Sequence, residues 1–263
     1  MPTHRLIRCI ALLSYLYFFG FEWSLDAQNT IPPGTIIPVE LQNSIDSQKS
    51  RVGQAVVARV AQELPLEGRV IRGRIKVLGE ITDVKKDSGQ AVVGLRFDRI
   101  ELGHNKIPIT TELRAIASFI AIQDAETPTD ASHGMMNSPY GRTTVQIGGD
   151  VVYHPSGPVQ SRTGETVGTP ICGVAQCGVL DRVESAPGPK CAGAVAADTH
   201  PQAIWVFSAD ACGVYGLIGL RFQNGSTISQ EGQIVFSSDK RVKLPSGTAL
   251  LLTVTGAQMR AGR

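Results

Sequence analysis

The amino-acid sequence predicts an all-β protein. The chain has 263 residues, among them 28 glycines and 15 prolines, which punctuate it into short segments. Within these segments apolar side chains recur at every second position, as is typical of strands, and no convincing helical pattern lies between them. We therefore expect a small β-barrel-like module at residues 31–122, a linker at 123–142 and a second, disulfide-stapled β-rich module at 143–256.

The N-terminal residues have the pattern of a secretory signal. Arg5 and Arg8 precede an uncharged apolar run at residues 9–21, which is shorter than the roughly 20 residues of a membrane-spanning helix. We expect a signal peptide at residues 1–27, cleaved after Ala27, and a periplasmic or secreted mature protein. An uncleaved N-terminal anchor is the alternative.

The first module begins with a turn followed by a strand. Ile37, Val39 and Leu41 share one face of an extended segment that follows Pro32-Pro33-Gly34-Thr35. Further alternating runs follow at turn-separated intervals, which indicates a small barrel or sandwich. The expected strands of this module lie at residues 31–41, 55–64, 69–81, 91–97 and 106–113.

The second module is expected to begin after the polar, proline-containing segment 123–142. Its expected strands lie at residues 143–153, 178–183, 203–207, 213–222 and 242–254. Pro245-Ser246-Gly247-Thr248 repeats the turn that opens the first module. The last strand therefore either belongs to a separate second module, which we favour, or returns to the first one and makes the middle of the chain an insertion.

Four cysteines follow the predicted signal peptide: Cys172, Cys177, Cys191 and Cys212. In an oxidising compartment an even number predicts two disulfides with three possible connectivities. We favour Cys172 with Cys177 and Cys191 with Cys212. The alternative is a zinc site with His200 as the nearby imidazole, but paired C-x-x-C ligands are missing, and we expect no metal and no cofactor.

The charge pattern indicates one candidate binding surface. With 25 basic and 23 acidic side chains, the formal net charge of +2 gives no indication of a nucleic-acid partner. Arg72, Arg74 and Lys76 alternate and would lie on one side of a strand. This basic ridge is a weak candidate site for an anionic envelope polymer or lipid headgroup, and the commoner interpretation of such alternation is an ordinary solvated strand face.

The sequence predicts no catalytic residue. A nucleophile reading would use Ser208 or Cys212, with His200 as base and Asp210 or Asp198 as the orienting group, but no G-x-S-x-G elbow is present. A glycosidase reading would need two carboxylates at a suitable separation. Its candidates are Glu165, Asp181, Glu184 and Asp198, and Trp205 is the only tryptophan after the signal peptide.

Several motifs also carry a resemblance to a known family. They are Ile31-Pro32-Pro33-Gly34-Thr35-Ile36-Ile37-Pro38-Val39, Ser44-Ile45-Asp46-Ser47, Val52-Gly53-Gln54, Gly79-Glu80, Phe97-Asp98-Arg99 and the closing segment 245–252. Together they resemble the C-terminal β-barrel of the TrbI-type scaffold of type IV secretion channels. The resemblance implies a barrel and a channel role, although Ile71-Arg72-Gly73-Arg74 replaces that family's Pro-Lys-Gly-Ser turn. Segments 144–153 and 208–216 resemble bacterial secreted β proteins of unassigned function.

These expectations favour a non-catalytic, exported, envelope-associated binding or scaffold protein. Its partner would be a cell-envelope protein or an anionic envelope polymer. One alternative is a component of a type IV secretion-like channel, which would form ring-like oligomers. The other alternative is a secreted hydrolase of cell-wall glycan or peptide.

Overall fold

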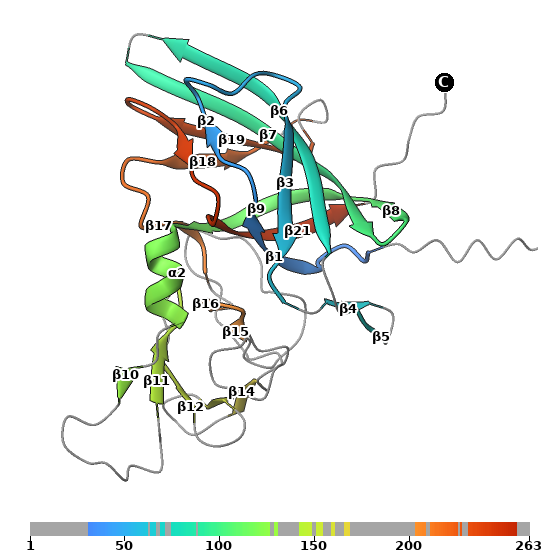
Figure 1. Cartoon of the computed structure of the whole chain (residues 1–263), viewed down its shortest axis with the longest axis vertical. Coiled ribbons are helices and arrows are strands. Elements are labelled where there is room, and N and C mark those ends of the chain that lie inside the picture. Colours follow the sequence, from blue (N-terminus) through green and yellow to red (C-terminus); the bar gives the residue numbers. More distant parts are fainter. Residues whose placement is uncertain are drawn as a thin grey trace, which may run out of the picture.

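The computed structural model confirms the all-β class (Figure 1). It describes residues 31–62, 64–66, 69–71, 75–87, 89–126, 129–130, 142–148, 151–154, 159–160, 166–168, 203–208, 211–225, 227 and 231–256. This part of the chain contains many strands and one helix, α2 (Phe119–Glu126). The predicted signal peptide at 1–27 and its cleavage site lie outside the described residues, so the predicted export stays a prediction.

The main element is a ten-stranded sheet. Its strands follow the order β17-β9-β21-β1-β3-β6-β7-β19-β18, and β8 pairs with β7. Neighbouring strands are antiparallel except for β17 and β9, which are parallel. The strands are β1 (Ile36–Leu41), β3 (Ala55–Val60), β6 (Lys76–Asp87), β7 (Gln90–Leu102), β8 (Asn105–Pro108), β9 (Thr110–Ala117), β17 (Gly213–Tyr215), β18 (Arg221–Asn224), β19 (Gln233–Ser238) and β21 (Ala249–Gly256).

The remaining strands form small sheets. Three are two-stranded: β2 (Ile45–Asp46) with β20 (Lys243–Leu244), β4 (Leu64–Leu66) with β5 (Arg69–Ile71), and β15 (Ala203–Ile204) with β16 (Phe207–Ser208). A five-stranded sheet contains β10 (Thr129–Asp130), β11 (Arg142–Val145), β12 (Val151–His154), β13 (Val159–Gln160) and β14 (Thr166–Gly168).

Strands from both expected modules share the large sheet. The last strand, β21, lies between β1 and β9, as Figure 1 shows in dark red between blue and green. β17, β18 and β19 also belong to this sheet. The predicted boundary near residue 143 therefore does not divide the strands into two sheets, and the observed pairing is the alternative in which the terminal strand returns.

Several local expectations were wrong. The expected strands at 143–153, 213–222 and 242–254 are each two strands, β11 with β12, β17 with β18, and β20 with β21. The expected strand at 106–113 is two strands, β8 and β9, on either side of Ile109. The expected linker at 123–142 begins inside α2. Ser118 caps this helix, because its Oγ accepts a hydrogen bond from Ala121 N at 3.3 Å. An eight-residue helix is too short to show a clear helical period in the sequence.

The large sheet curls until its two ends meet. The Asn224 carboxamide on β18 donates from Nδ2 to Leu113 O on β9 and accepts at Oδ1 from Leu113 N, both at 2.9 Å. Register shifts in β6 and β21 bend their strands, as β-bulges do. Where β7 has an extra residue, Asp98, a Cβ on the facing Gly79 of β6 would lie 2.1 Å from Arg96 O, so only glycine fits.

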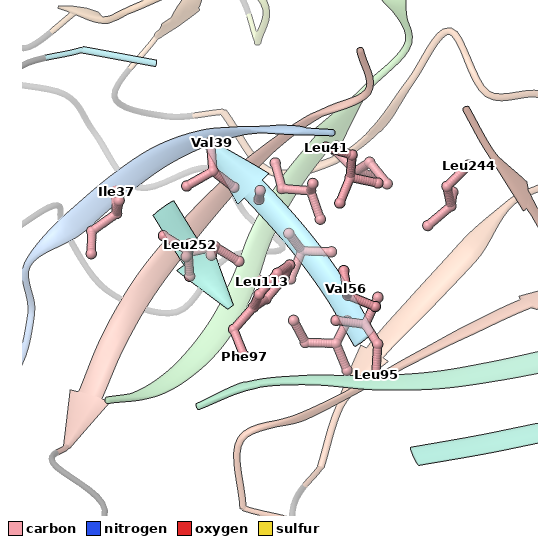
Figure 2. Packing of buried hydrophobic residues seen from close by; sticks show 14 of the residues in the cluster. Ile37, Val39, Leu41, Val56, Leu95, Phe97, Leu113, Leu244 and Leu252 are labelled. Carbon is pink, nitrogen blue, oxygen red and sulfur yellow. The ribbon is translucent and has the colours of Figure 1, made fainter. Parts of the chain in front are cut away.

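The core fills the inside of the curled sheet. Figure 2 shows side chains from β1, β3, β7, β9, β20 and β21 pointing toward one another. Phe97 and Phe236 are among the largest side chains that are fully buried there. A second apolar cluster on the outer face joins small residues of β9 and β21 to α2 and to Phe207. Ile204, Val206, Phe207 and Ala211 thereby pack against the sheet.

Candidate functional site

The predicted basic ridge is described only in part. Arg72 and Arg74 lie outside the described residues, and Lys76 opens β6. Lys76 is exposed between two buried neighbours, Ile75 and Val77. This alternation is the one that the sequence predicts, with the basic side chain facing away from the core.

A neighbouring acid compensates part of the Lys76 charge. Lys76 Nζ lies 3.9 Å from Glu101 Oε2, and the two residues face each other in the β6 and β7 register. More than half of the Lys76 side chain is exposed, so this pair contributes little to stability and leaves the ammonium accessible to solvent.

Of the nucleophile reading, the structure describes the two candidate nucleophiles, Ser208 and Cys212. Ser208 is buried, and its Oγ has no hydrogen-bond partner. A Cβ on Gly148 would approach that Oγ within 2.9 Å, so the hydroxyl is packed against backbone. The Cys212 backbone is held by Tyr215, whose Oη accepts from Cys212 N at 3.1 Å and donates to Cys212 O at 2.9 Å.

Most other predicted site residues lie outside the described residues. These are His200, Asp198 and Asp210 of the nucleophile reading, Glu165, Asp181 and Glu184 of the glycosidase reading, and Cys172, Cys177 and Cys191. The two disulfides stay a prediction for this reason. Within the described ranges, no group of three His, Cys, Asp or Glu side chains is placed to hold a metal ion.

The sequence analysis missed a cluster around Trp205. Trp205 and Val206 form the two-residue turn between β15 and β16. Trp205 has φ of +52°, the one positive φ among the described non-glycine residues. This conformation costs a non-glycine residue about 1 kcal/mol, and hairpin turns of this length usually place Gly or Asn there. Such strain persists only where the surrounding structure holds the residue in place.

Side chains from two distant segments and from its own hairpin hold Trp205. Its backbone N–H donates to Gln62 Oε1 at 2.7 Å, and its indole Nε1–H donates to Glu126 Oε1 at 3.0 Å. The ring packs edge-on against Phe207, with centroids 6.3 Å apart. The indole stays partly exposed. Sequence reasoning lacked the pairing of residues 62, 126 and 205, which only the fold supplies.

Glu126 ends α2 without a basic partner. In the described part of the chain, no Lys, Arg or His forms an ion pair with Glu126, and the last turn of α2 contains no basic residue. An acid at a helix C-terminus is unfavourable, because the helix dipole places partial negative charge there. The carboxylate therefore adds to a local negative potential beside the indole.

The same turn has a buried acceptor beside it. Ile147 N donates to Val206 O at 2.8 Å, which places the preceding residue, Gln146, next to the Trp205 turn. Gln146 is 8% exposed, and its Oε1 has no hydrogen-bond partner. Leaving such an acceptor unsatisfied costs about 1–3 kcal/mol.

The strongest ion pair lies elsewhere and is structural. Arg241 Nε donates to Asp46 Oδ1 at 2.8 Å, and Arg241 Nη2 also donates to Asp46 Oδ2. These hydrogen bonds from Arg241 are the main reason that the pKa of Asp46 is lowered to about 2. The pair fixes the segment of β2 against the segment of β20, which are hydrogen-bonded strands.

Comparisons of this chain with protein-family models, with curated proteins and with solved structures found no match. The fold and the sites are therefore argued from the residues themselves. A search of the described residues for a helix long and apolar enough to cross a membrane found none.

Proposed function

We propose that the protein is a non-catalytic, exported binding or scaffold module of the cell envelope. The observation that carries this proposal is Lys76, an outward-facing cation at the start of a strand whose neighbouring side chains are buried. Arg72 and Arg74 precede it at alternating positions in the sequence. The partner that suits three cations at alternating sequence positions is an anionic envelope polymer or lipid headgroup.

The position of Ser208 supports a binding role over a hydrolytic one. A serine nucleophile must reach both a base and its substrate. The Ser208 hydroxyl is buried beside Gly148, so a substrate has no access to it in this structure. The large sheet that carries Lys76 is extensively hydrogen-bonded, which makes it a rigid support for a binding surface.

Export can be tested directly. The signal pattern of residues 1–27 predicts that N-terminal sequencing of the protein from the periplasm or medium begins at Gln28. Recovery of the full chain from the cytosol, starting at Met1, would contradict the exported location.

The binding surface is tested by a matched pair of triple variants. Replacing Arg72, Arg74 and Lys76 by Gln removes the ridge, and we expect weaker retention on anionic glycan or anionic lipid beads in low salt. The control replaces three exposed lysines elsewhere, which are Lys85, Lys86 and Lys106. Both variants change the net charge equally, so only position differs. Equal retention of the two variants would refute the ridge as the binding surface.

A further inference from the structure

We propose that Asn224-Gly225 is a deamidation site that the closed sheet protects, and that its reaction makes opening of the sheet irreversible. The site lies at the seam where β18 meets β9, and it does not depend on the proposed function. Asn224 is the one asparagine of the chain that is followed by glycine. It is also the residue whose carboxamide bonds to both the N–H and the C=O of Leu113 across the seam.

The dipeptide contains both groups that deamidation needs. The backbone nitrogen of Gly225 attacks Asn224 Cγ, a new N–C bond forms, and the Cγ–Nδ2 bond breaks. Ammonia leaves, taking up the proton that the Gly225 nitrogen has lost. Water, the only co-reactant, then opens the succinimide ring and leaves an aspartate or an isoaspartate. Glycine favours this reaction, because it has no Cβ to obstruct the attack and its backbone adopts the required conformation easily.

In the closed sheet, the two reacting groups are held by opposite neighbours of β18. Gly225 N donates to Gln233 O at the start of β19, at 2.8 Å. The Asn224 carboxamide bonds instead to Leu113 on β9, at 2.9 Å for both hydrogen bonds. The attacking nitrogen is therefore directed toward β19, whereas the carbon that it must reach is held toward β9. Hydrogen bonds must break before the ring forms, so the reaction rate follows the population of a locally open state.

Neither product of the reaction restores the closed seam. β18 is a four-residue strand at the end of the strand order, and such a strand is among the first parts of a sheet to open locally. An aspartate lacks the Nδ2 donor that bonds to Leu113 O in the closed sheet. An isoaspartate also adds a methylene group to the main chain of β18, which disturbs its register with β19. A transient opening thereby becomes permanent once Asn224 has reacted.

Asn43 provides a contrast within the same chain. Its carboxamide also bonds to a strand at both ends, because Nδ2 donates to Ala55 O at 3.0 Å and Oδ1 accepts from Val57 N at 2.7 Å. Asn43 is followed by Ser44, whose side chain obstructs the attack. Asn43 is therefore an internal control with similar bonding and a less reactive neighbour.

Mass spectrometry of tryptic peptides tests the protection. Trypsin releases Asn224 in the peptide 222–240, which contains no other asparagine. The full chain is incubated at mildly alkaline pH, either folded in buffer or unfolded in guanidinium chloride, and fragmentation assigns each converted residue. We expect Asn224 to convert at least about tenfold more slowly in the folded chain, and faster than Asn43 in the unfolded chain. Equal rates for Asn224 in the two states, or no conversion in the unfolded chain, would overturn the proposal.

The stability of the product tests the irreversible opening. The deamidated chain carries one more negative charge, so ion exchange separates it from the unreacted chain, and we expect its urea midpoint to be lower. Gly225→Ala is the matched variant, because it keeps the carboxamide and obstructs the attack. During storage in urea below the midpoint, this variant should lose stability at least about tenfold more slowly than the wild type. An unchanged midpoint of the deamidated chain, or equally fast loss of stability in Gly225→Ala, would overturn the role of this site.

Discussion

Asn224→Asp is the sharpest test of how the large sheet closes. The Asn224 carboxamide bonds to both the N–H and the C=O of Leu113 at 2.9 Å, in the way that the backbone of a neighbouring strand would. The two side chains have nearly the same shape. A carboxylate still accepts from Leu113 N, but it places a second acceptor against Leu113 O, where the amide had a donor.

The expected cost follows from these two bonds. One hydrogen bond of about 1 kcal/mol is lost, and the buried carbonyl of Leu113 is left facing a negative charge, which costs roughly 1–3 kcal/mol more. The total is about 2–4 kcal/mol. For a chain of this size each kcal/mol lowers the melting temperature by about 2–4 °C, so we expect a fall of roughly 5–15 °C.

Urea unfolding followed by circular dichroism measures the difference in free energy. Asn105→Asp, an exposed asparagine at the start of β8, is the matched control and should change the stability by less than about 0.5 kcal/mol. If Asn224→Asp stays within that margin of the wild type, the carboxamide does not close the sheet and the reasoning fails.

Three further predictions address packing, pH and the cysteines. Gly79→Ala should prevent folding or cost more than 3 kcal/mol in urea unfolding, because its Cβ would meet Arg96 O at 2.1 Å, whereas Gly256→Ala should be nearly neutral since nothing lies within 4 Å; similar stability of both variants would contradict the bulge. Because the folded-state pKa of Asp46 is lowered from 3.8 to about 2, its contribution is present above about pH 4 and is lost as the pH falls toward 2. Asp46→Asn should therefore flatten the urea midpoint against pH over that window, and an unaltered slope would exclude the pair as its cause. Thiol titration of the denatured, unreduced exported protein should detect no free thiol among Cys172, Cys177, Cys191 and Cys212, and detection of thiols would exclude two disulfides.

The sequence predicted the fold class and most strands of the first module because local alternation sets them. Ile37, Val39 and Leu41 are all fully buried as expected, although Pro38 between the first two is buried as well. The sequence also predicted the alternation of buried and exposed side chains around Lys76. Both features depend only on the two-residue period of a strand, which neighbouring residues reveal.

The sequence did not predict in the same way which distant strands pair with each other. The parallel contact of β17 with β9 and the insertion of β21 between β1 and β9 join segments far apart in the chain. The Trp205 cluster has the same origin, since Gln62 and Glu126 reach Trp205 only in the folded chain. The α2 helix was missed because eight residues give a weak pattern that tertiary packing then decides.

Two similar turns, at residues 32–35 and 245–248, connect strands that are far apart in the sequence. In each turn the threonine Oγ1 donates to the proline carbonyl, Thr35 to Pro32 at 2.6 Å and Thr248 to Pro245 at 2.7 Å. Gly34 and Gly247 have φ of +85° and +83°.

Each turn caps the end of the opposite strand. Gly34 N donates to Val254 O at the end of β21, and Gly247 N donates to Leu41 O at the end of β1. The two turns therefore join β1 and β21 in an approximately two-fold symmetric way, with Gly34 and Gly247 in equivalent positions. Because β21 lies between β1 and β9, these two strands keep unpaired edges until residues 249–256 are in place. Closure of the sheet thus requires strands that are far apart in the sequence, which is compatible with slow, non-local assembly.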